Sequence, residues 1–387
     1  LIGQMTVTEK LGQLTQLAPF FLGMEPNMDL TGPMNDLKLR PEWIKEIGST
    51  LNGFGAKELK ALQDKHMAGS RLHIPLLFMA DIVHGYKTGF PIPLAIGCSF
   101  CPELYEKPCE ISAKEGAASG IHLTFAPMTD LVRDPRWGRV MESTGEDHYL
   151  NAEMTKAAVL GYQGKDLKEK GRLAACVKHF AAYGMPWGGR DYNTVDMSEG
   201  ILREFYLPAY KAALDVGVAM VMTSFNTVNR IPASANKWLM RDILRKEWGF
   251  NGVVISDFAA VDETITHGVS ANSEEGELIS TIAIATSSIV TTVIIVLGVI
   301  LIAPLTPVLQ APALQPAFEQ MLPALFGGLG VAFVSKNWKI AVAPVVLMLI
   351  LFIFVPDLNA GTVGIMVPVS ALFTIGVSRL MYKEGVL

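Results

Sequence analysis

Residues 252–258 read GVVISDF, an apolar run that ends in the carboxylate of Asp257 and the aromatic ring of Phe258. A short run of β-branched residues without polar alternation is typical of a parallel strand that is covered on both faces. A carboxylate at the end of such a strand can serve as a nucleophile, a base or a metal ligand, or it can cap a helix starting near Ala259. The residues alone leave these roles open.

The same pattern recurs along the first two thirds of the chain. Five more apolar runs precede GVVISD, namely IGSTL (47–51), PLLFMAD (75–81), IHLTFAP (121–127), LAACVKH (173–179) and VAMVMTSFN (218–226). Helical patterns such as DHYLNAEMTKAAVLGY separate them, and Thr6 and Glu9 have the spacing of a capping box near the start of the chain. Alternating strands and helices predict an α/β fold with a parallel sheet.

We expect these strands to form a TIM-like (β/α) barrel, with the strand ends gathered at one mouth. A doubly wound open sheet would also bind its ligand at that edge of the sheet, so the pattern alone does not decide the architecture. Six strands are recognisable before residue 277, whereas a closed barrel of this type has eight. The sequence therefore predicts a barrel that is truncated at about six strands.

Several charged side chains fall where the mouth of this barrel is expected. Asp81 ends one run, Lys178 and His179 end another, and Asp130 follows a third. Arg139 lies in DLVRDPRWGRVMESTGED (130–147), a long loop that is dense in charge. Loops at such a mouth carry binding residues, although charge exposed to solvent is the simpler interpretation.

The composition argues against several classes of protein. The chain has 387 residues and a net charge of -5, and it has no long basic run, so we expect no nucleic-acid partner. No glycine-rich phosphate motif follows any predicted strand, and we expect no cofactor. Cys98, Cys101 and Cys109 have no histidine at ligand spacing, so buried thiols are a better interpretation than a zinc site, and we predict no metal.

Six ordered motifs resemble the N-terminal domain of glycoside hydrolase family 3, the β-glucosidase and β-xylosidase family. The resemblance covers residues 1–272 and rests on MADIVHGYKTGFPIPLAIG, TFAPMTDLVRDPRWGRVMESTGEDHYL, VKHFAAYG, GGRDYNTVDMSE, VMTSFNTVN and GVVISDF. It implies that Asp257 is the nucleophile of a retaining mechanism that acts on a β-linked glucoside or xyloside. The residues that it implies for sugar binding are Asp81, Arg139, Lys178, His179 and Arg190, with Met222 lining the innermost subsite and Phe258 as an aromatic wall.

The acid/base residue of the family is not evident in this chain. The resemblance implies a glutamate from a second domain or a histidine in the loop after the K-H-F motif, and here that loop reads AAYGMPWGGRD. Asp191 and Glu142 are the possible substitutes. Phe225 also stands where many relatives have tyrosine. We therefore predict a glycoside hydrolase that hydrolyses O-glycosyl bonds and is incomplete in its acid/base residue.

The last third of the chain has a different character. Only seven charged residues follow Glu277, and residues 278–302 contain none, whereas about 20 apolar residues suffice to cross a bilayer. Further candidate spans are 317–334, 340–355 and 362–381. We predict two domains, a barrel (1–277) and an all-α transmembrane segment of three to four helices (278–387) in contact with the lipid bilayer.

The distribution of basic residues predicts the orientation of these spans. By the positive-inside rule, the loop with Lys336 and Lys339 and the chain end with Arg379 and Lys383 are cytoplasmic. With four spans, the barrel then lies in the cytoplasm as well. We therefore expect a multi-pass membrane protein with its barrel in the cytoplasm. The alternative function is a transporter-like fragment fused, artificially or by accident, to an inactive glycosidase barrel.

Overall fold

The parallel sheet contains every strand that the sequence predicts and one more. The structure, a computed structural model, describes residues 1–18 and 45–284. Seven strands pair in the order β1-β2-β3-β4-β5-β6-β9, and each neighbouring pair is parallel. Their bounds are β1 (Gln16–Leu17), β2 (Ser49–Leu51), β3 (Leu77–Ala80), β4 (Leu123–Thr124), β5 (Ala174–Phe180), β6 (Met220–Thr223) and β9 (Val253–Ile255).

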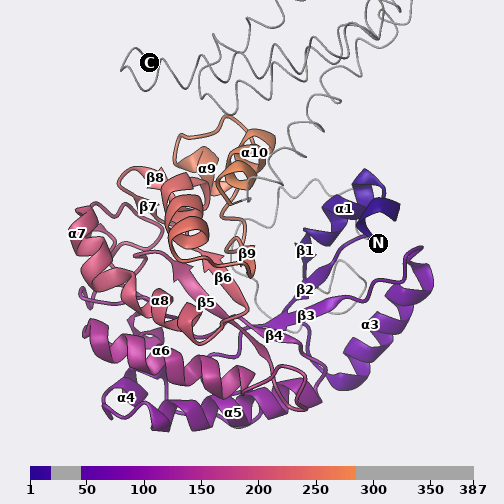
Figure 1. The fold of residues 1–387 in the computed structure, drawn as a ribbon, viewed down its shortest axis with the longest axis horizontal. Coiled ribbons are helices and arrows are strands. Elements are labelled where there is room, and N and C mark those ends of the chain that lie inside the picture. Colours follow the sequence, from indigo (N-terminus) through magenta and orange to yellow (C-terminus); the bar gives the residue numbers. More distant parts are fainter. Residues whose placement is uncertain (19–44, 285–387) are drawn as a thin grey trace, which may run out of the picture. The chain divides into compact units, whose positions relative to one another are not determined.

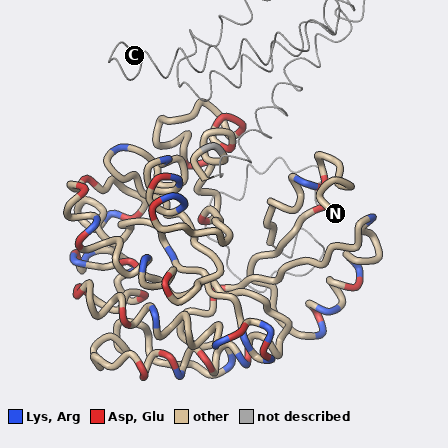
Figure 2. The backbone as a smooth tube through the Cα atoms, viewed as in Figure 1, with Lys and Arg blue, Asp and Glu red and all other residues tan. Residues whose placement is uncertain are grey.

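Helices cover the outside of the curled sheet (Figure 1). The α-helices are α1 (Val7–Gln13), α3 (Ala56–Gly69), α4 (Pro93–Gly97), α5 (Glu103–Ala118), α6 (His148–Gln163), α7 (Glu199–Ile201), α8 (Pro208–Asp215), α9 (Glu263–Thr266) and α10 (Ser273–Ile284). Two segments have π-helical hydrogen bonding, η6 (Leu202–Tyr206) and η8 (Trp238–Glu247). Figure 2 shows that charged residues lie mainly on these outer elements, which leaves the strands largely apolar.

The strands separate two layers of packed side chains. On β6, Val221 packs in the large core beneath the helices, whereas Met220 and Met222 pack in a second cluster with Met79, Leu123, Phe125 and Cys176. Side chains of a strand point alternately to its two faces, so this second cluster fills the inner side of the curve. Two-sided burial explains why the strands read as continuous apolar runs.

The predicted TIM-like α/β architecture is confirmed as a curled parallel half-barrel, but the predicted strand number is wrong. β1 is the strand that sequence reasoning missed, because two residues carry no periodicity. A short antiparallel hairpin, β7 (Thr227–Val228) and β8 (Ile231–Pro232), also went unrecognised. The predicted capping box is present, since Thr6 Oγ1 accepts from the N–H of Glu9 at 3.2 Å and Glu9 Oε2 accepts from that of Thr6 at 2.7 Å.

The predicted boundary between the two domains, after residue 277, falls within α10. This helix spans residues 273–284, so it includes the first seven residues of the predicted span 278–302, and it packs against α9 and η8. Ser280 and Ala283 are buried. In the described part of the chain, no helix is long and apolar enough to cross a bilayer. The remainder of this span and the other three lie outside the described residues, and the domain boundary after residue 277 stays a prediction.

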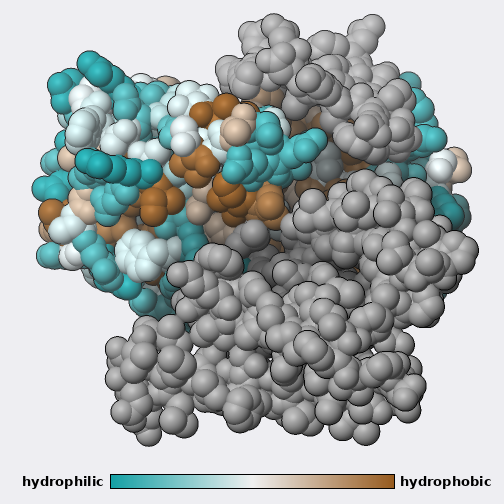
Figure 3. Space-filling view, turned by 90° about the horizontal axis from the view of Figure 1, so that it is seen from above, coloured by the Kyte–Doolittle hydropathy of each residue, from teal (hydrophilic) through white to brown (hydrophobic). Residues whose placement is uncertain are grey.

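Apolar side chains also reach the surface of the half-barrel. Figure 3 shows hydrophobic residues in the central part of the described surface on one face, with hydrophilic residues around them. Val253 on β9 is 56% exposed, and β9 is an edge strand of the sheet formed by the described residues. Burial of the apolar strands is therefore less complete at this edge than at the centre of the sheet.

The close packing of α5 and α6 gives a testable expectation for stability. A Cβ at Gly161 would press on the carbonyl oxygen of Glu106 and lie 2.7 Å from Cys109 Cβ. Overpacking of this kind costs about 1–3 kcal/mol, so we expect Gly161→Ala to lower the free energy of unfolding by that amount in denaturant titration of the full chain.

Gly69→Ala in α3 is the matched control for this substitution. A Cβ there meets nothing within 4 Å, and alanine favours the helix over glycine. The control should leave stability unchanged or raise it slightly. Equal unfolding midpoints for the two variants would contradict the packing described for α5 and α6.

Candidate active site

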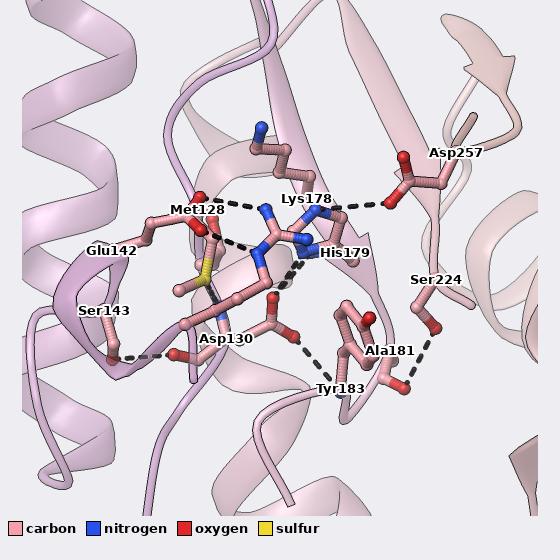
Figure 4. A network of polar contacts seen from close by, with 12 residues as sticks. Met128, Asp130, Glu142, Ser143, Lys178, His179, Ala181, Tyr183, Ser224 and Asp257 are labelled. Carbon is pink, nitrogen blue, oxygen red and sulfur yellow. Dashed lines mark hydrogen bonds and ion pairs between the residues drawn. The ribbon is translucent and has the colours of Figure 1, made fainter. Parts of the chain in front are cut away.

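The carboxyl ends of β3, β5 and β9 bring four of the predicted site residues to one place. Asp81 follows β3, Lys178 and His179 lie within β5, and Asp257 follows β9. Figure 4 shows the side chains of His179 and Asp257 directed toward each other, with Lys178 next to His179. Residues that are far apart in sequence meet here because parallel strands all end at the same edge.

Asp257 is largely buried and only partly satisfied by hydrogen bonds. Its side chain is 13% exposed, and Oδ1 accepts from the backbone N–H of Phe258 at 2.7 Å. Oδ2 lies 3.4 Å from His179 Nε2 and has no hydrogen-bond partner among the described residues. Burial raises the pKa of Asp257 to about 6, against the opposing effect of the Lys178 charge. The carboxylate is thus ionised at neutral pH, with one oxygen free to react.

Lys178 and Asp81 form an ion pair beside this carboxylate. Lys178 Nζ donates to Asp81 Oδ1 at 2.8 Å, and the lysine side chain is only 6% exposed. Asn52 donates from Nδ2 to Asp81 Oδ2 at 3.2 Å. Burial is the largest single influence, and by itself it would lower the pKa of Lys178 and raise that of Asp81. The charge and hydrogen bond of the partner, together with neighbouring groups, outweigh burial, so the pKa of Lys178 is raised and that of Asp81 is lowered. Both groups therefore remain charged.

His179 is held from behind by Asp130. His179 Nδ1 lies 2.8 Å from Asp130 Oδ2, and that oxygen also accepts from the backbone N–H of His179 at 3.0 Å. Burial, with the nearby charges of Arg139 and Lys178, holds the pKa of His179 well below its usual value. The imidazole is therefore neutral in the folded chain.

Arg139 reaches the site from the charged loop that follows β4. Its guanidinium binds Glu142 in a bidentate manner, with Nε to Oε1 at 2.6 Å and Nη2 to Oε2 at 2.9 Å. Burial alone would lower the pKa of Arg139, but the hydrogen bonds and the charge of Glu142, together with the charge of Asp257, outweigh burial, and the pKa is raised. Arg139 also lies over the ring of Tyr183, 5.7 Å from its centroid. The predicted location of this arginine at the barrel mouth agrees with this geometry.

The three remaining predicted site residues are Met222, Phe258 and Arg190. Met222 packs in the inner cluster of the sheet, and Phe258 packs against a separate cluster that includes Trp137 and Tyr183. Arg190 is exposed, and its side chain makes no hydrogen bond or ion pair with another described residue. Of the two possible acids, Glu142 is bound to Arg139, and Asp191 accepts from Trp137 Nε1 at 2.9 Å.

Sequence reasoning missed the residues that support this site. Asp130 was noticed as a polar strand-end residue but received no role, while Asn52 and Tyr210 carried no signal. Glu263 in α9 was also missed, although burial, with the Asp257 and Asp191 charges, raises its pKa to about 7. Its spacing of six residues after Asp257 was the only available clue. The contacts by which these residues support the site join positions that are distant in sequence, so no local motif predicts them.

Two similar proteins match most of the described chain. A protein named periplasmic beta-glucosidase from Salmonella typhimurium is 43% identical over 277 residues, which are 71% of this chain and 35% of that protein. The crystal structure of a beta-glucosidase from Listeria innocua in complex with glucose is 52% identical with a TM-score of 0.69, over 73% of this chain and 40% of that one. The chain thus spans little more than a third of the length of these relatives.

The predicted location in a membrane, with a cytoplasmic barrel, is wrong. The Salmonella relative is named periplasmic, and the structure describes no helix that could cross a bilayer in residues 1–18 and 45–284. The prediction took the absence of charge after Glu277 as a sign of lipid contact. In the described start of that segment, buried residues of α10 instead face neighbouring protein elements.

Family assignment rests on a match that includes the whole site. The model of the glycosyl hydrolase family 3 N-terminal domain matches residues 6–290, which continue beyond the predicted boundary at residue 277. A putative beta-xylosidase from Formosa agariphila is 32% identical over 270 residues, 66% of this chain and 36% of that protein. The chain belongs to glycosyl hydrolase family 3, through the N-terminal domain of that family.

Proposed function

We propose that this chain is the nucleophile-bearing part of a retaining glycoside hydrolase that acts on β-glucosides. The observation that carries the proposal is the Asp257 carboxylate at a strand end beside Lys178 and His179. Its Oδ2 has no hydrogen-bond partner within residues 1–18 and 45–284. In a retaining mechanism such an oxygen attacks the anomeric carbon and forms a covalent glycosyl-enzyme, which water then hydrolyses. An acid/base carboxyl group would be needed about 5 Å away.

The charged groups around Asp257 suit the binding of sugar hydroxyls. Asp81, with a side chain 39% exposed, can accept hydrogen bonds from two neighbouring hydroxyls, while Lys178 and Arg139 can donate to them. Hydrogen bonds to charged groups are roughly twice as strong as those between neutral groups. We assign Asp81, Arg139, Lys178 and His179 to the innermost sugar subsite, and Phe258 to its wall. The exposed Arg190 is proposed as an outer donor, and Met222 as packing beneath the subsite.

Glucose is the sugar that the names of the relatives with 43% and 52% identity indicate. One relative is named a beta-glucosidase, and the Listeria innocua enzyme has been crystallised with glucose and, as a mutant, with laminaribiose. Other relatives are named beta-xylosidases, so a β-xyloside is the second substrate to test. The alternative of a transporter-like fragment finds no support in these relatives or in the described residues.

The first test identifies the nucleophile. The full chain is incubated with a 2-deoxy-2-fluoro-β-glucoside that has an activated aryl leaving group, and the labelled peptide is identified by mass spectrometry. An activated leaving group needs little help from an acid, so we expect the label on Asp257 even where disaccharides are not cleaved. Azide should then accelerate turnover of nitrophenyl β-glucosides by intercepting the glycosyl-enzyme.

Two variants complete this test. Asp257→Ala should abolish labelling, whereas Asp166→Ala, which removes a surface carboxylate outside the site, should leave it unchanged. A label on Glu142, Asp191 or Glu263 instead would refute the assignment of Asp257. Efficient cleavage of cellobiose would show that the chain supplies its own acid.

A second expectation concerns the effect of the buried Asp257 carboxylate on the stability of the fold at different pH values. Its folded pKa of about 6 lies above the ordinary value of 3.8, so folding favours the protonated form. The corresponding stability is fully present below pH 3.8 and is lost as the pH rises through 6. Asp257→Asn removes this ionisation, so it should stabilise the chain more at pH 8 than at pH 4.5, by about 2 kcal/mol.

Urea titrations of the full chain at these two pH values measure the difference. Asp64→Asn is the control, because the Asp64 side chain is 65% exposed in α3 and should show no comparable pH dependence. A stabilisation that is equal at both pH values would contradict the raised pKa of Asp257.

A further inference from the structure

Asp130 is the most deeply buried carboxyl group near the nucleophile, and the proposed mechanism gives it no role. Its side chain is 0% exposed, so it is closed off from a bound sugar. Figure 4 shows the His179 ring between Asp130 and Asp257. Asp130 contacts this imidazole, so it can act on Asp257 through the ring.

The hydrogen-bond partners of Asp130 are almost all donors. Oδ2 accepts from the backbone N–H of His179 at 3.0 Å, and Oδ1 accepts from that of Tyr183 at 3.2 Å. The Tyr210 hydroxyl lies 3.1 Å from Oδ1 and 2.6 Å from the carbonyl oxygen of His179, so its one hydrogen is shared between two acceptors. An ionised carboxylate is an acceptor only. When Asp130 is ionised, the fourth partner, His179 Nδ1 at 2.8 Å, must therefore carry a hydrogen.

The position of that hydrogen decides what His179 presents to Asp257. A neutral imidazole has one N–H, and its other nitrogen is an acceptor. With the hydrogen on Nδ1, the lone pair of Nε2 faces the site. The distance of 3.4 Å from Nε2 to Asp257 Oδ2 exceeds the usual N–H···O range of about 2.7–3.2 Å, which agrees with the absence of a hydrogen between them.

The opposite arrangement would need a protonated Asp130. Burial raises the pKa of Asp130 to about 7, so its acid form has to be weighed. An acid hydrogen on Oδ2 would have to point at Nδ1 while the same oxygen accepts from the His179 backbone. His179 would then carry its hydrogen on Nε2 and donate it to the nucleophile. A donor there would lower the electron density available on the attacking oxygen.

We propose that Asp130 is a positioning residue that holds His179 in the Nδ1–H tautomer, so that Nε2 faces Asp257 as an acceptor for a hydroxyl hydrogen of the bound sugar. Asp257 Oδ2 then receives no hydrogen bond from the protein and keeps its lone pairs for the anomeric carbon. A carboxylate that orients a histidine and selects its tautomer is a general device in enzyme sites. The role in sugar binding rests on the proposed function, whereas the tautomer does not.

The tautomer can be measured directly in the full chain without substrate. In a sample labelled with ¹⁵N-histidine, correlations from the ring C–H hydrogens to Nδ1 and Nε2 show which nitrogen carries hydrogen. The His179 signals are assigned by their loss in His179→Gln. At pH 7 we expect hydrogen on Nδ1 and a bare Nε2. Hydrogen on Nε2 in the unmodified chain would overturn the proposal whether or not the chain is active.

Variants test whether Asp130 is the cause. Asp130→Asn replaces the carboxylate by a weaker acceptor whose amide can donate to Nδ1, so the Nδ1–H population should fall. The rate of Asp257 labelling by the fluoroglucoside should fall at least tenfold. The matched control is Asp134→Asn in the same loop, where the carboxylate binds Arg136, and it should change neither quantity.

The outcomes separate this inference from the proposed function. An Asp130→Asn chain that folds with an unchanged tautomer and labelling rate would overturn the role of Asp130. If this variant does not fold, the tautomer in the unmodified chain still decides. If the unmodified chain shows the Nδ1–H tautomer but is never labelled, the proposed hydrolase function fails while the tautomer assignment stands.

Discussion

The ion pair between Lys178 and Asp81 is the constraint on which the candidate site depends. A buried ammonium group is costly unless an opposite charge lies close by, and Lys178 at the end of β5 has Asp81 at 2.8 Å. Asn52 completes the shell of Asp81 from the loop after β2. The charge of Lys178 is therefore tolerated only while β2, β3 and β5 keep their register. The same charge lowers the pKa of Asp257, which burial would otherwise raise further.

Asp257 shows how the environment balances reactivity against stability. Full solvation would leave a carboxylate easily ionised but surrounded by water, and complete burial would keep it protonated. Here the side chain is largely buried, with Lys178 and Arg139 near enough to keep its pKa at about 6. One oxygen is held by the Phe258 N–H and the other has no hydrogen-bond partner in the described part of the chain. The unsatisfied oxygen is costly to the fold and useful to a nucleophile.

Buried groups that do not face the site also determine how His179 is held beside Asp257. Asp130 and the Tyr210 hydroxyl bind His179 from the side away from Asp257, and the backbone N–H of Tyr183 donates to Asp130. A mechanism described only by the groups that touch a sugar would omit them. Because these groups are buried, each of their polar atoms needs a hydrogen-bond partner, and few other side chains could take their place. Substitutions at these positions should disturb reactivity and folding together.

Much of the fold was predictable from local sequence. Apolar runs located six of the seven strands of the sheet, because strands covered on both faces must be continuously hydrophobic. β1 escaped because two residues give no pattern. Hydrophobicity was a poor guide after Glu277, where the described residues of α10 pack against protein. An apolar run has the same composition whether lipid or protein surrounds it.

The sequence by itself determined the family, the parallel α/β architecture and the strand-end positions of Asp81, Lys178, His179 and Asp257. These follow from motifs and periodicity, which are local properties. Only the tertiary structure decided that Asp130 contacts His179, that Asn52 donates to Asp81 and that Met222 packs in the inner cluster of the sheet. Hydrogen-bond partners and pKa values depend on distances between residues that are far apart in the chain. Those distances exist only once the sheet has curled and its strand ends have met.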